Sequence, residues 1–234
     1  MLYFHKEKLV ILCQPKTGTT ALHEAIFSQS SIAFNTPPHM KHMTYGKFMR
    51  VLAPWISGGG EFARPKYTMV CVMREPIEWF GSWYRYNSRD ALASPQNRSH
   101  SRYTGNISFN DYLEALLLPK DEMPDYAKLG GPCSIAMDNQ GRIGVDHLFP
   151  YTAMDNLVDF VSSKLGKTIR LSEANISVKR GLEADPATME KVRQKFKFEF
   201  DVYAKLRSDG VVSKELKAIA NIRKEELKAE SDEA

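Results

Sequence analysis

A short apolar run that leads into a glycine-bearing turn constrains the fold of this chain more than any other feature of its sequence. Residues 8–14, Lys-Leu-Val-Ile-Leu-Cys-Gln, are continuous and rich in branched side chains, which predicts a strand buried on both faces. The turn Gln14-Pro15-Lys16-Thr17-Gly18-Thr19-Thr20 follows at once, and residues 19–29 then show helical apolar spacing. A buried strand that passes through a tight turn into a helix predicts an α/β fold.

The rest of the chain repeats this alternation of strands and helices. A short apolar run predicts a buried strand at residues 67–73, and residues 143–151 are predicted as a third strand. The helices are predicted at residues 76–87, 108–118, 153–165 and 186–200. The alternation predicts one α/β domain over residues 1–234, with a central, mainly parallel sheet flanked by helices. A charged C-terminal helix at about 213–234 is expected as an appendage, and residues 31–66 and 88–106 are expected to be irregular.

Capping residues mark where several of these helices begin and end. Pro76 and Pro186 suit the first turn of a helix, because the N–H that proline lacks is not needed there. Ser108 and Asp111 have the spacing of a capping box. Gly166 suits the residue just past a helix end.

Composition excludes several classes of protein. The chain has 234 residues, 43% hydrophobic and 26% charged, which excludes a disordered or fibrous protein. The net charge of +4 suits a small polyanionic ligand but is too weak to argue for nucleic acid. Its longest apolar runs have five residues, whereas a membrane span needs about 20, so no span is expected. Three widely spaced cysteines and the absence of a signal-peptide pattern predict reduced thiols and a cytoplasmic protein.

The turn at residues 14–20 has the chemistry of a phosphate cradle. Gly18 permits a tight turn, the N–H groups at the helix start attract an anion, and Lys16 adds a positive charge. Three hydroxyl donors accompany them: Thr17, Thr19 and Thr20. The turn lacks the Walker pattern of kinases and ATPases, because Lys16 precedes its only glycine. The structural alternative is a plain solvated turn between a strand and a helix.

A second candidate anion site follows the second predicted strand. Arg74 is expected at the carboxyl end of that strand, where ligands bind in open α/β sheets, and its guanidinium fork suits a phosphate. Ser82 lies about two helical turns further on and adds a hydroxyl. An arginine at a strand end is, on its own, more often part of a structural ion pair. Two anion sites on neighbouring strand ends indicate a ligand with two separated phosphate groups.

These motifs resemble those of one enzyme family. Pro-Lys-Thr-Gly-Thr-Thr at residues 15–20 resembles the 5′-phosphosulfate loop of the sulfotransferases that use 3′-phosphoadenylyl sulfate (PAPS), and Arg74-x-Pro76 with Ser82 resembles their 3′-phosphate motif. The likeness continues in four further segments: residues 41–44 (Lys-His-Met-Thr), 143–157, 171–177 and 200–203. The first and third of these segments resemble the carbohydrate-type branch, as does Ala21, where phenol and steroid sulfotransferases usually carry tryptophan.

The resemblance implies a P-loop-NTPase-like sulfotransferase fold and an activity. Such an enzyme moves a sulfuryl group from PAPS to a hydroxyl of a saccharide or glycolipid, and no metal is expected. Lys16 is expected to stabilise the bridging oxygen of the donor. The loop amides, with Thr17, Thr19 and Thr20, are expected to hold the 5′-phosphate and the sulfonate. Arg74 and Ser82 are expected to hold the 3′-phosphate.

The acceptor hydroxyl needs a general base. His42 is the first candidate, because histidine titrates near neutral pH, and His39 and Glu24 are its rivals. Lys41 is expected to support the sulfonate or the acceptor. The basic turn at residues 179–181 is either a further 3′-phosphate contact or, more commonly for such a run, a solvated loop.

Other interpretations stay open at this point. The chain is alternatively a non-catalytic nucleotide-binding relative, a sulfotransferase for a non-carbohydrate alcohol, or a P-loop kinase, which the loop order disfavours. The aromatic cluster at residues 79–86 stacks on a ligand or, as its helical spacing favours, fills the core. Residues 88–103, rich in arginine, either gate an anionic acceptor or form a plain loop. Glu75 adjoins the predicted 3′-phosphate site and is expected to point away from it.

Overall fold

The computed structural model describes residues 1–57, 67–172 and 180–219. The chain forms two compact units, each made of segments that are separate in the sequence. The first unit comprises residues 1–74, 132–174 and 201–234, and the second comprises residues 75–131 and 175–200. The prediction of one domain over the whole chain stays a prediction.

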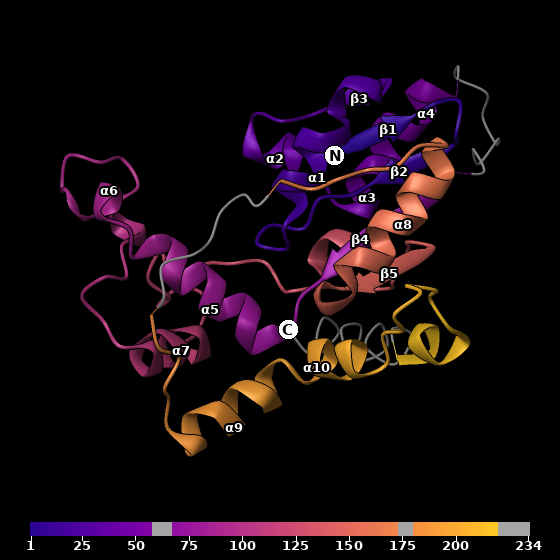
Figure 1. Cartoon of the computed structure of the whole chain (residues 1–234). Helices are drawn as coiled ribbons and strands as arrows, with labels where there is room; N and C mark the ends of the chain where they lie inside the picture. Colours follow the sequence, from indigo (N-terminus) through magenta and orange to yellow (C-terminus); the bar gives the residue numbers. More distant parts are fainter. Residues whose placement is uncertain (58–66, 173–179, 220–234) are drawn as a thin grey trace. The chain divides into compact units, whose positions relative to one another are not determined.

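A five-stranded sheet forms the centre of the first unit (Figure 1). In sheet order its strands are β3 (Ile32–Ala33), β1 (Leu2–Phe4), β2 (Leu9–Ile11), β4 (Thr68–Met73) and β5 (His147–Pro150). β2, β4 and β5 run parallel, whereas β1 pairs antiparallel with both β2 and β3. The α/β class is confirmed, but the sheet is mixed, so the prediction of a mainly parallel sheet missed its antiparallel strands.

The strands predicted at residues 8–14, 67–73 and 143–151 contain β2, β4 and β5, which form the parallel part of this sheet. The third prediction is too long, because residues 143–146 and Tyr151 lie outside β5. Every residue of β2 is buried, and in β4 only Thr68 is partly exposed. This continuous burial explains the uninterrupted apolar runs, because parallel sheets are covered on both faces. Leu9 lies opposite Thr68 and Val70 opposite His147, so the carboxyl ends of β2, β4 and β5 meet at one edge of the sheet.

Helices α1 (Thr19–Ile26) and α8 (Met154–Leu165) share one hydrophobic cluster with the sheet. The cluster is made of Leu22, Ile26, Leu157 and Val161 from the helices and of Leu2, Phe4, Leu9, Ile11, Val70, Val72, Phe149 and Ile169. A 3-10 turn, η1 (Phe27–Gln29), continues α1, which confirms the predicted helix at residues 19–29. α8 ends at Gly166, whose φ of 66° places it in the left-handed region, as predicted for a C-terminal glycine.

The sequence predicts irregular structure at residues 31–66, and this is wrong for β3 and for most of residues 38–56. Residues 38–56 contain α2 (Pro38–Lys41), α3 (Tyr45–Lys47), the π-helical segment η2 (Phe48–Leu52) and α4 (Ala53–Ile56). Pro38 and Pro54 stand in the first turns of α2 and α4, where proline is tolerated, so they begin helices. Pro54 has no N–H to donate to a carbonyl one helical turn earlier. Just before it, the N–H of Ala53 donates to the carbonyl of Phe48, five residues earlier, which is the π-helical pattern.

The second unit is helical and has its own core. Its elements are α5 (Pro76–Asn87), α6 (Asp90–Ala93), η3 (His100–Arg102), α7 (Phe109–Leu117) and α9 (Pro186–Lys195). Trp79, Phe80 and Tyr84 are buried together with Tyr112 and Leu113, which confirms the core interpretation of most of the aromatic cluster. Residues 88–106, expected to be irregular, contain α6 and η3.

Capping explains the helix boundaries of this unit. Ser108 and Asp111 form the predicted capping box, in which each side chain bonds the backbone N–H of the other residue. The single helix predicted for residues 186–200 is wrong, because the chain forms α9 and then α10 (Lys197–Ala204). The two helices are separated at Phe196, whose ψ of 26° departs from helical geometry.

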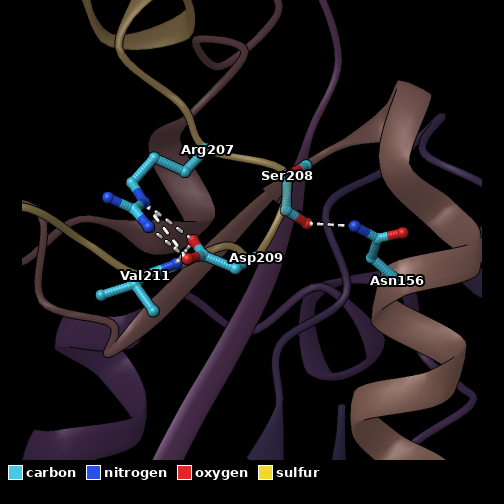
Figure 2. A network of polar contacts seen from close by, with 5 residues as sticks. All are labelled: Asn156, Arg207, Ser208, Asp209 and Val211. Atoms are coloured by element: carbon cyan, nitrogen blue, oxygen red, sulfur yellow. Dashed lines mark hydrogen bonds and ion pairs between the residues drawn. The ribbon is translucent and has the colours of Figure 1, made fainter.

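The chain after α10 is joined to β5 and α8 in the first unit. The N–H of Leu148 donates to the carbonyl of Gly210 at 2.7 Å. Figure 2 shows the neighbouring polar contacts, in which Arg207 pairs with Asp209 and the Asn156 carboxamide donates to the Ser208 carbonyl at 3.0 Å. Residues 214–219 are helical, as predicted, and residues 220–234 of that expected helix lie outside the described residues.

Two short 3-10 turns complete the first unit, η4 (Ser134–Ala136) and η5 (Tyr151–Ala153). The three cysteines, Cys13, Cys71 and Cys133, are buried and are not joined in disulfides. Within the described part of the chain, no helix is both long enough and apolar enough to cross a membrane.

Candidate functional site

The predicted phosphate cradle is a tight turn between β2 and α1. Lys16 has a φ of 64° and Gly18 a φ of 68°, so two residues of the turn adopt the left-handed conformation. Gly18 is the N-cap residue of α1 and is exposed, so the first N–H groups of the helix follow an accessible backbone position. Lys16 is not a glycine, and its left-handed backbone costs about 1–2 kcal/mol, which the turn must offset.

Two of the three predicted hydroxyl donors serve the turn itself. The hydroxyls of Thr17 and Thr19 donate to the carbonyl of Gln14, at 2.8 and 3.2 Å, and both threonines are buried. The Gln14 side chain in turn accepts the N–H of Ile135 at 3.2 Å. A hydroxyl hydrogen committed to a carbonyl is not available to an anion. Besides the Lys16 side chain, the donors that the turn offers to an anion are therefore its backbone N–H groups and the half-buried Thr20.

Tyr151 connects this turn to Arg74. Tyr151 directly follows β5, and a Cβ on Gly18 would lie 3.2 Å from its ring atom Cε2. The guanidinium carbon of Arg74, which directly follows β4, lies 4.9 Å from the centroid of the same ring. A cation at this distance over an aromatic face is attracted to it. Three neighbouring strand ends thus place the glycine turn, Tyr151 and Arg74 together.

The segment at residues 41–44 packs against the same turn. The ammonium of Lys41 lies 3.4 Å from the hydroxyl oxygen of Thr20. The Nδ1 atom of His42 lies 2.6 Å from the carbonyl oxygen of Cys13, one residue before the turn. The structure therefore places both Lys41 and His42 beside the predicted phosphate cradle.

The hydrogen bond of His42 fixes which ring nitrogen is basic. A carbonyl oxygen only accepts, so Nδ1 carries the hydrogen and the neutral ring has its lone pair on Nε2. Burial lowers the pKa of His42, and the positive charge of Lys41 lowers it further, against the opposing effect of the bond to Cys13. The ring is therefore neutral at pH 7, which is the form that takes up a proton.

The two rival bases lie elsewhere on the same elements. His39 is exposed on α2, and Glu24 is exposed on α1, whose buried face is formed by other residues. His42, by contrast, bonds the carbonyl of Cys13, which lies between β2 and the turn. The geometry favours His42, and its assignment as the base stays a prediction.

Ser82 and Glu75 belong to the second unit, whereas Arg74 ends a segment of the first. Ser82 is buried on α5, and its pairing with Arg74 at a 3′-phosphate stays a prediction. The carboxylate of Glu75 caps α5 by accepting the N–H of Glu78 at 2.8 Å. Burial raises the pKa of Glu75 against the lowering effect of that bond.

The basic turn at residues 179–181 is described only from Arg180 onward. Neither sequence interpretation fits Arg180, because its guanidinium donates to backbone carbonyls within the second unit, those of Thr104 at 2.9 Å and Ile107 at 2.7 Å. It also lies 4.4 Å from the ring centroid of Tyr84. Arg180 therefore has a structural role in the second unit. Lys179 lies outside the described residues, as do residues 173–177 of the segment that resembles the sulfotransferases.

Sequence reasoning missed Tyr151 and the internal role of Gln14. Tyr151 carries one usable signal, since it is an aromatic residue directly after a predicted strand. Gln14 carries none, because its contact with Ile135 joins residues that are far apart in the sequence.

No family model, curated protein or solved structure matches this chain. Among the described residues, no group of three or more His, Cys, Asp or Glu side chains is arranged to hold a metal ion. The function is therefore inferred from the residues of the chain alone.

Proposed function

We propose that the protein is a PAPS-dependent sulfotransferase that acts on a hydroxyl group of a saccharide or glycolipid. The observation that supports this most is the shared contact of Tyr151 with Gly18 and Arg74 at neighbouring strand ends. A turn that presents backbone N–H groups suits one anionic group, and an arginine fork suits a second. A nucleotide with phosphates at its 5′ and 3′ positions supplies two such groups.

Sulfuryl transfer resembles phosphoryl transfer, in which positioning and electrostatic stabilisation supply most of the catalysis. The acceptor oxygen forms a bond to sulfur while the bond between sulfur and the bridging oxygen of the donor breaks. The Lys16 ammonium stabilises the negative charge that develops on that bridging oxygen. Lys41, beside Thr20, adds a second positive charge next to the turn.

His42 takes the proton of the acceptor hydroxyl in the same step. Its Nε2 atom carries the lone pair, because Nδ1 donates to the Cys13 carbonyl. That hydrogen bond also holds the ring in one orientation, and its carbonyl acceptor stabilises the imidazolium that forms. The proton then leaves to solvent after the adenosine 3′,5′-bisphosphate product departs.

Nucleotide discrimination tests this function directly. Adenosine 3′,5′-bisphosphate and adenosine 5′-monophosphate differ only in the 3′-phosphate, which we assign to Arg74. A charge-assisted hydrogen bond contributes about 1.5–3 kcal/mol, so the bisphosphate should bind at least about tenfold more tightly. Titration calorimetry should show that Arg74→Ala removes most of this difference, whereas Arg170→Ala, an exposed arginine of the same unit, leaves it unchanged. Equal affinities in the wild-type protein would defeat the proposal, and a strict need for Mg²⁺ would favour a kinase.

Turnover separates an enzyme from a non-catalytic nucleotide-binding relative. Lys16→Gly should lower sulfate transfer by about 10²–10³, because one charge-stabilising donor is lost. The same change relieves a left-handed backbone, so the thermal midpoint should not fall. Mass spectrometry with labelled PAPS and a panel of saccharide, glycolipid and small alcohol acceptors measures the transfer. Nucleotide binding without transfer to any of them would favour the non-catalytic alternative, and near-normal turnover of Lys16→Gly would contradict the role of Lys16.

A further inference from the structure

An open cleft of about 400 Å³ lies in the first unit beside α3 and η2. One wall is helical and carries Tyr45, Met49 and Arg50. The opposite wall is the turn at residues 138–142, which carries Asn139, Gln140 and Arg142. None of these residues belongs to the proposed donor site. Tyr45 is three residues from His42, and Thr44 between them caps α3 by accepting the N–H of Lys47 at 3.1 Å.

The turn that forms one wall is held rigidly. One carboxylate oxygen of Asp138 accepts the N–H groups of Gln140 and Arg142, at 2.8 and 3.0 Å. The other oxygen accepts the guanidinium of Arg142 at 2.7 Å. These bonds fix the backbone beneath Asn139 and Gln140, whose side chains are exposed. The turn therefore presents two exposed carboxamides, each with both donor and acceptor atoms, from a fixed backbone.

Gly46 lets the two walls approach each other. Its N–H donates to the carbonyl of Met137 at 3.3 Å. A Cβ at position 46 would lie 2.5 Å from Oδ1 of Asn139, which is too close for an unaltered contact. The missing side chain thus leaves space for the Asn139 carboxamide, and any larger residue must displace it.

The residues that line the cleft carry a net positive charge. Arg142 is paired with Asp138, so these two residues contribute no net charge. Arg50 is exposed on η2, and it makes no ion pair with any residue that the structure describes. One uncompensated guanidinium therefore lies at the cleft, together with the phenol of Tyr45 and the two carboxamides.

This combination is suited to one class of ligand. Carboxamides and a phenol exchange hydrogen bonds with the many hydroxyls of a sugar ring, and a guanidinium pairs with a carboxylate. We propose that the cleft binds an acidic sugar residue of the acceptor, with Arg50 on its carboxylate. This inference rests on the proposed sulfotransferase function and extends it, because it selects acidic over neutral saccharides as acceptors.

The test measures saccharide binding in the absence of nucleotide. The probes are a hyaluronan tetrasaccharide, which carries uronic acids, and the same tetrasaccharide with its carboxylates reduced to alcohols. In an NMR titration of the ¹⁵N-labelled protein, the acidic probe should bind at least about tenfold more tightly and shift the amide signals of Gly46, Asn139 and Gln140. Arg50→Gln should remove this preference, while the matched variant Arg170→Gln keeps it.

A second variant tests the shape of the cleft without changing its charge. Gly46→Ala should weaken binding of both probes several-fold by displacing Asn139, and circular dichroism should show an intact fold, because alanine is a favourable helix residue. Equal binding of the two probes, no binding of either, or an equal loss in Arg170→Gln would overturn the proposal. Discrimination between the two adenosine nucleotides, measured separately, decides the donor function. Loss of that discrimination with saccharide binding intact would refute the sulfotransferase and leave an acidic-saccharide site.

Discussion

The lowered pKa of His42 has a measurable effect on the pH dependence of turnover. Burial, reinforced by Lys41, lowers the pKa of the ring below its ordinary value of 6.5. The base form is the unprotonated form, so it is fully present above that lowered pKa and is lost as the pH falls through it. Turnover should therefore decline with falling pH at a lower pH than it would with an unperturbed histidine as the base.

The prediction for His42→Gln is a turnover lower by about 10²–10⁴, with nucleotide affinity retained and the acidic decline removed. Steady-state rates between pH 5 and 8 measure both effects. Glu24→Gln and His39→Gln, changes at the two exposed rivals, should keep the wild-type profile. An active His42→Gln protein beside an inactive Glu24→Gln or His39→Gln protein would show that the base had been assigned to the wrong residue.

At the scale of elements, Arg180 organises the second unit. Its guanidinium bonds the carbonyls of Thr104 and Ile107, and its own carbonyl accepts Nε of Arg85 on α5 at 2.9 Å. One residue thus ties the loop before α7 to α5. A planar fork reaches several carbonyls at once, which a lysine ammonium does not reproduce.

Arg180→Lys should destabilise the protein by about 1.5–3 kcal/mol, because charge-assisted bonds to partly buried carbonyls are lost. Urea unfolding gives the free energy, and amide hydrogen exchange should show faster opening at residues 104–107. Arg89→Lys is the matched control, since Arg89 is exposed and its guanidinium contacts the carbonyl and ring of Tyr86 in its own local turn. Unchanged stability of Arg180→Lys would mean that this tie is dispensable.

Elements defined by local pattern could be predicted from the sequence. β2 and nearly all of β4 are continuous buried runs, and α5, α7 and α8 carry the expected first-turn proline, capping box and terminal glycine. β1 and β3 could not be predicted in this way. β3 has two residues, too few for a pattern. β1 has three residues, as β2 has, but it is not followed by the turn and helix that mark β2 as a strand, and it is held by antiparallel pairing with β2 and β3.

The candidate site was predictable in part for a similar reason. The order of residues in the turn was enough to predict Lys16 and Gly18 as parts of the site. The position of Arg74 at the end of a predicted strand was enough to predict it as a further part. The commitment of the Thr17 hydroxyl to Gln14 depends on the backbone path of the turn, which composition does not encode. The ring of Tyr151 meets Gly18 only once β5 has paired with β4. This last contact could not be predicted, because the local sequence pattern does not show which distant segments come into contact.

At the scale of the whole molecule, the free energy of unfolding should decrease as the pH falls below about 6.5, before most carboxylates become protonated. His23 is buried on α1, and its Nε2 atom finds no hydrogen-bond partner among the described residues. Burial, with nearby positive charges, lowers its pKa to about 4. Between pH 6.5 and about 4 the unfolded chain binds a proton that the folded chain excludes, so stability falls with pH across this window.

Thermal unfolding measured at intervals from pH 7 to pH 4 should therefore show a falling midpoint. His23→Phe removes the titrating ring but keeps an aromatic partner for Phe27, so it should flatten this dependence. His39→Gln, a change at an exposed histidine, should leave the slope as in the wild-type protein. An unaltered slope in His23→Phe would exclude His23 as its source, and His42 would then be the histidine to change next.

The discontinuity of the first unit has a consequence for synthesis on the ribosome. β4 and β5 are neighbours in the sheet, yet 73 residues, 74–146, separate them in the sequence. At about 5–20 residues per second, translation needs roughly 4–15 s to supply β5 after β4 has emerged. During that interval the strand Thr-Met-Val-Cys-Val-Met has unpaired backbone groups along one side and carries no charge. The nascent chain is then a template for pairing with other nascent chains, and occupancy of that edge by a chaperone would lower the fraction lost to aggregation.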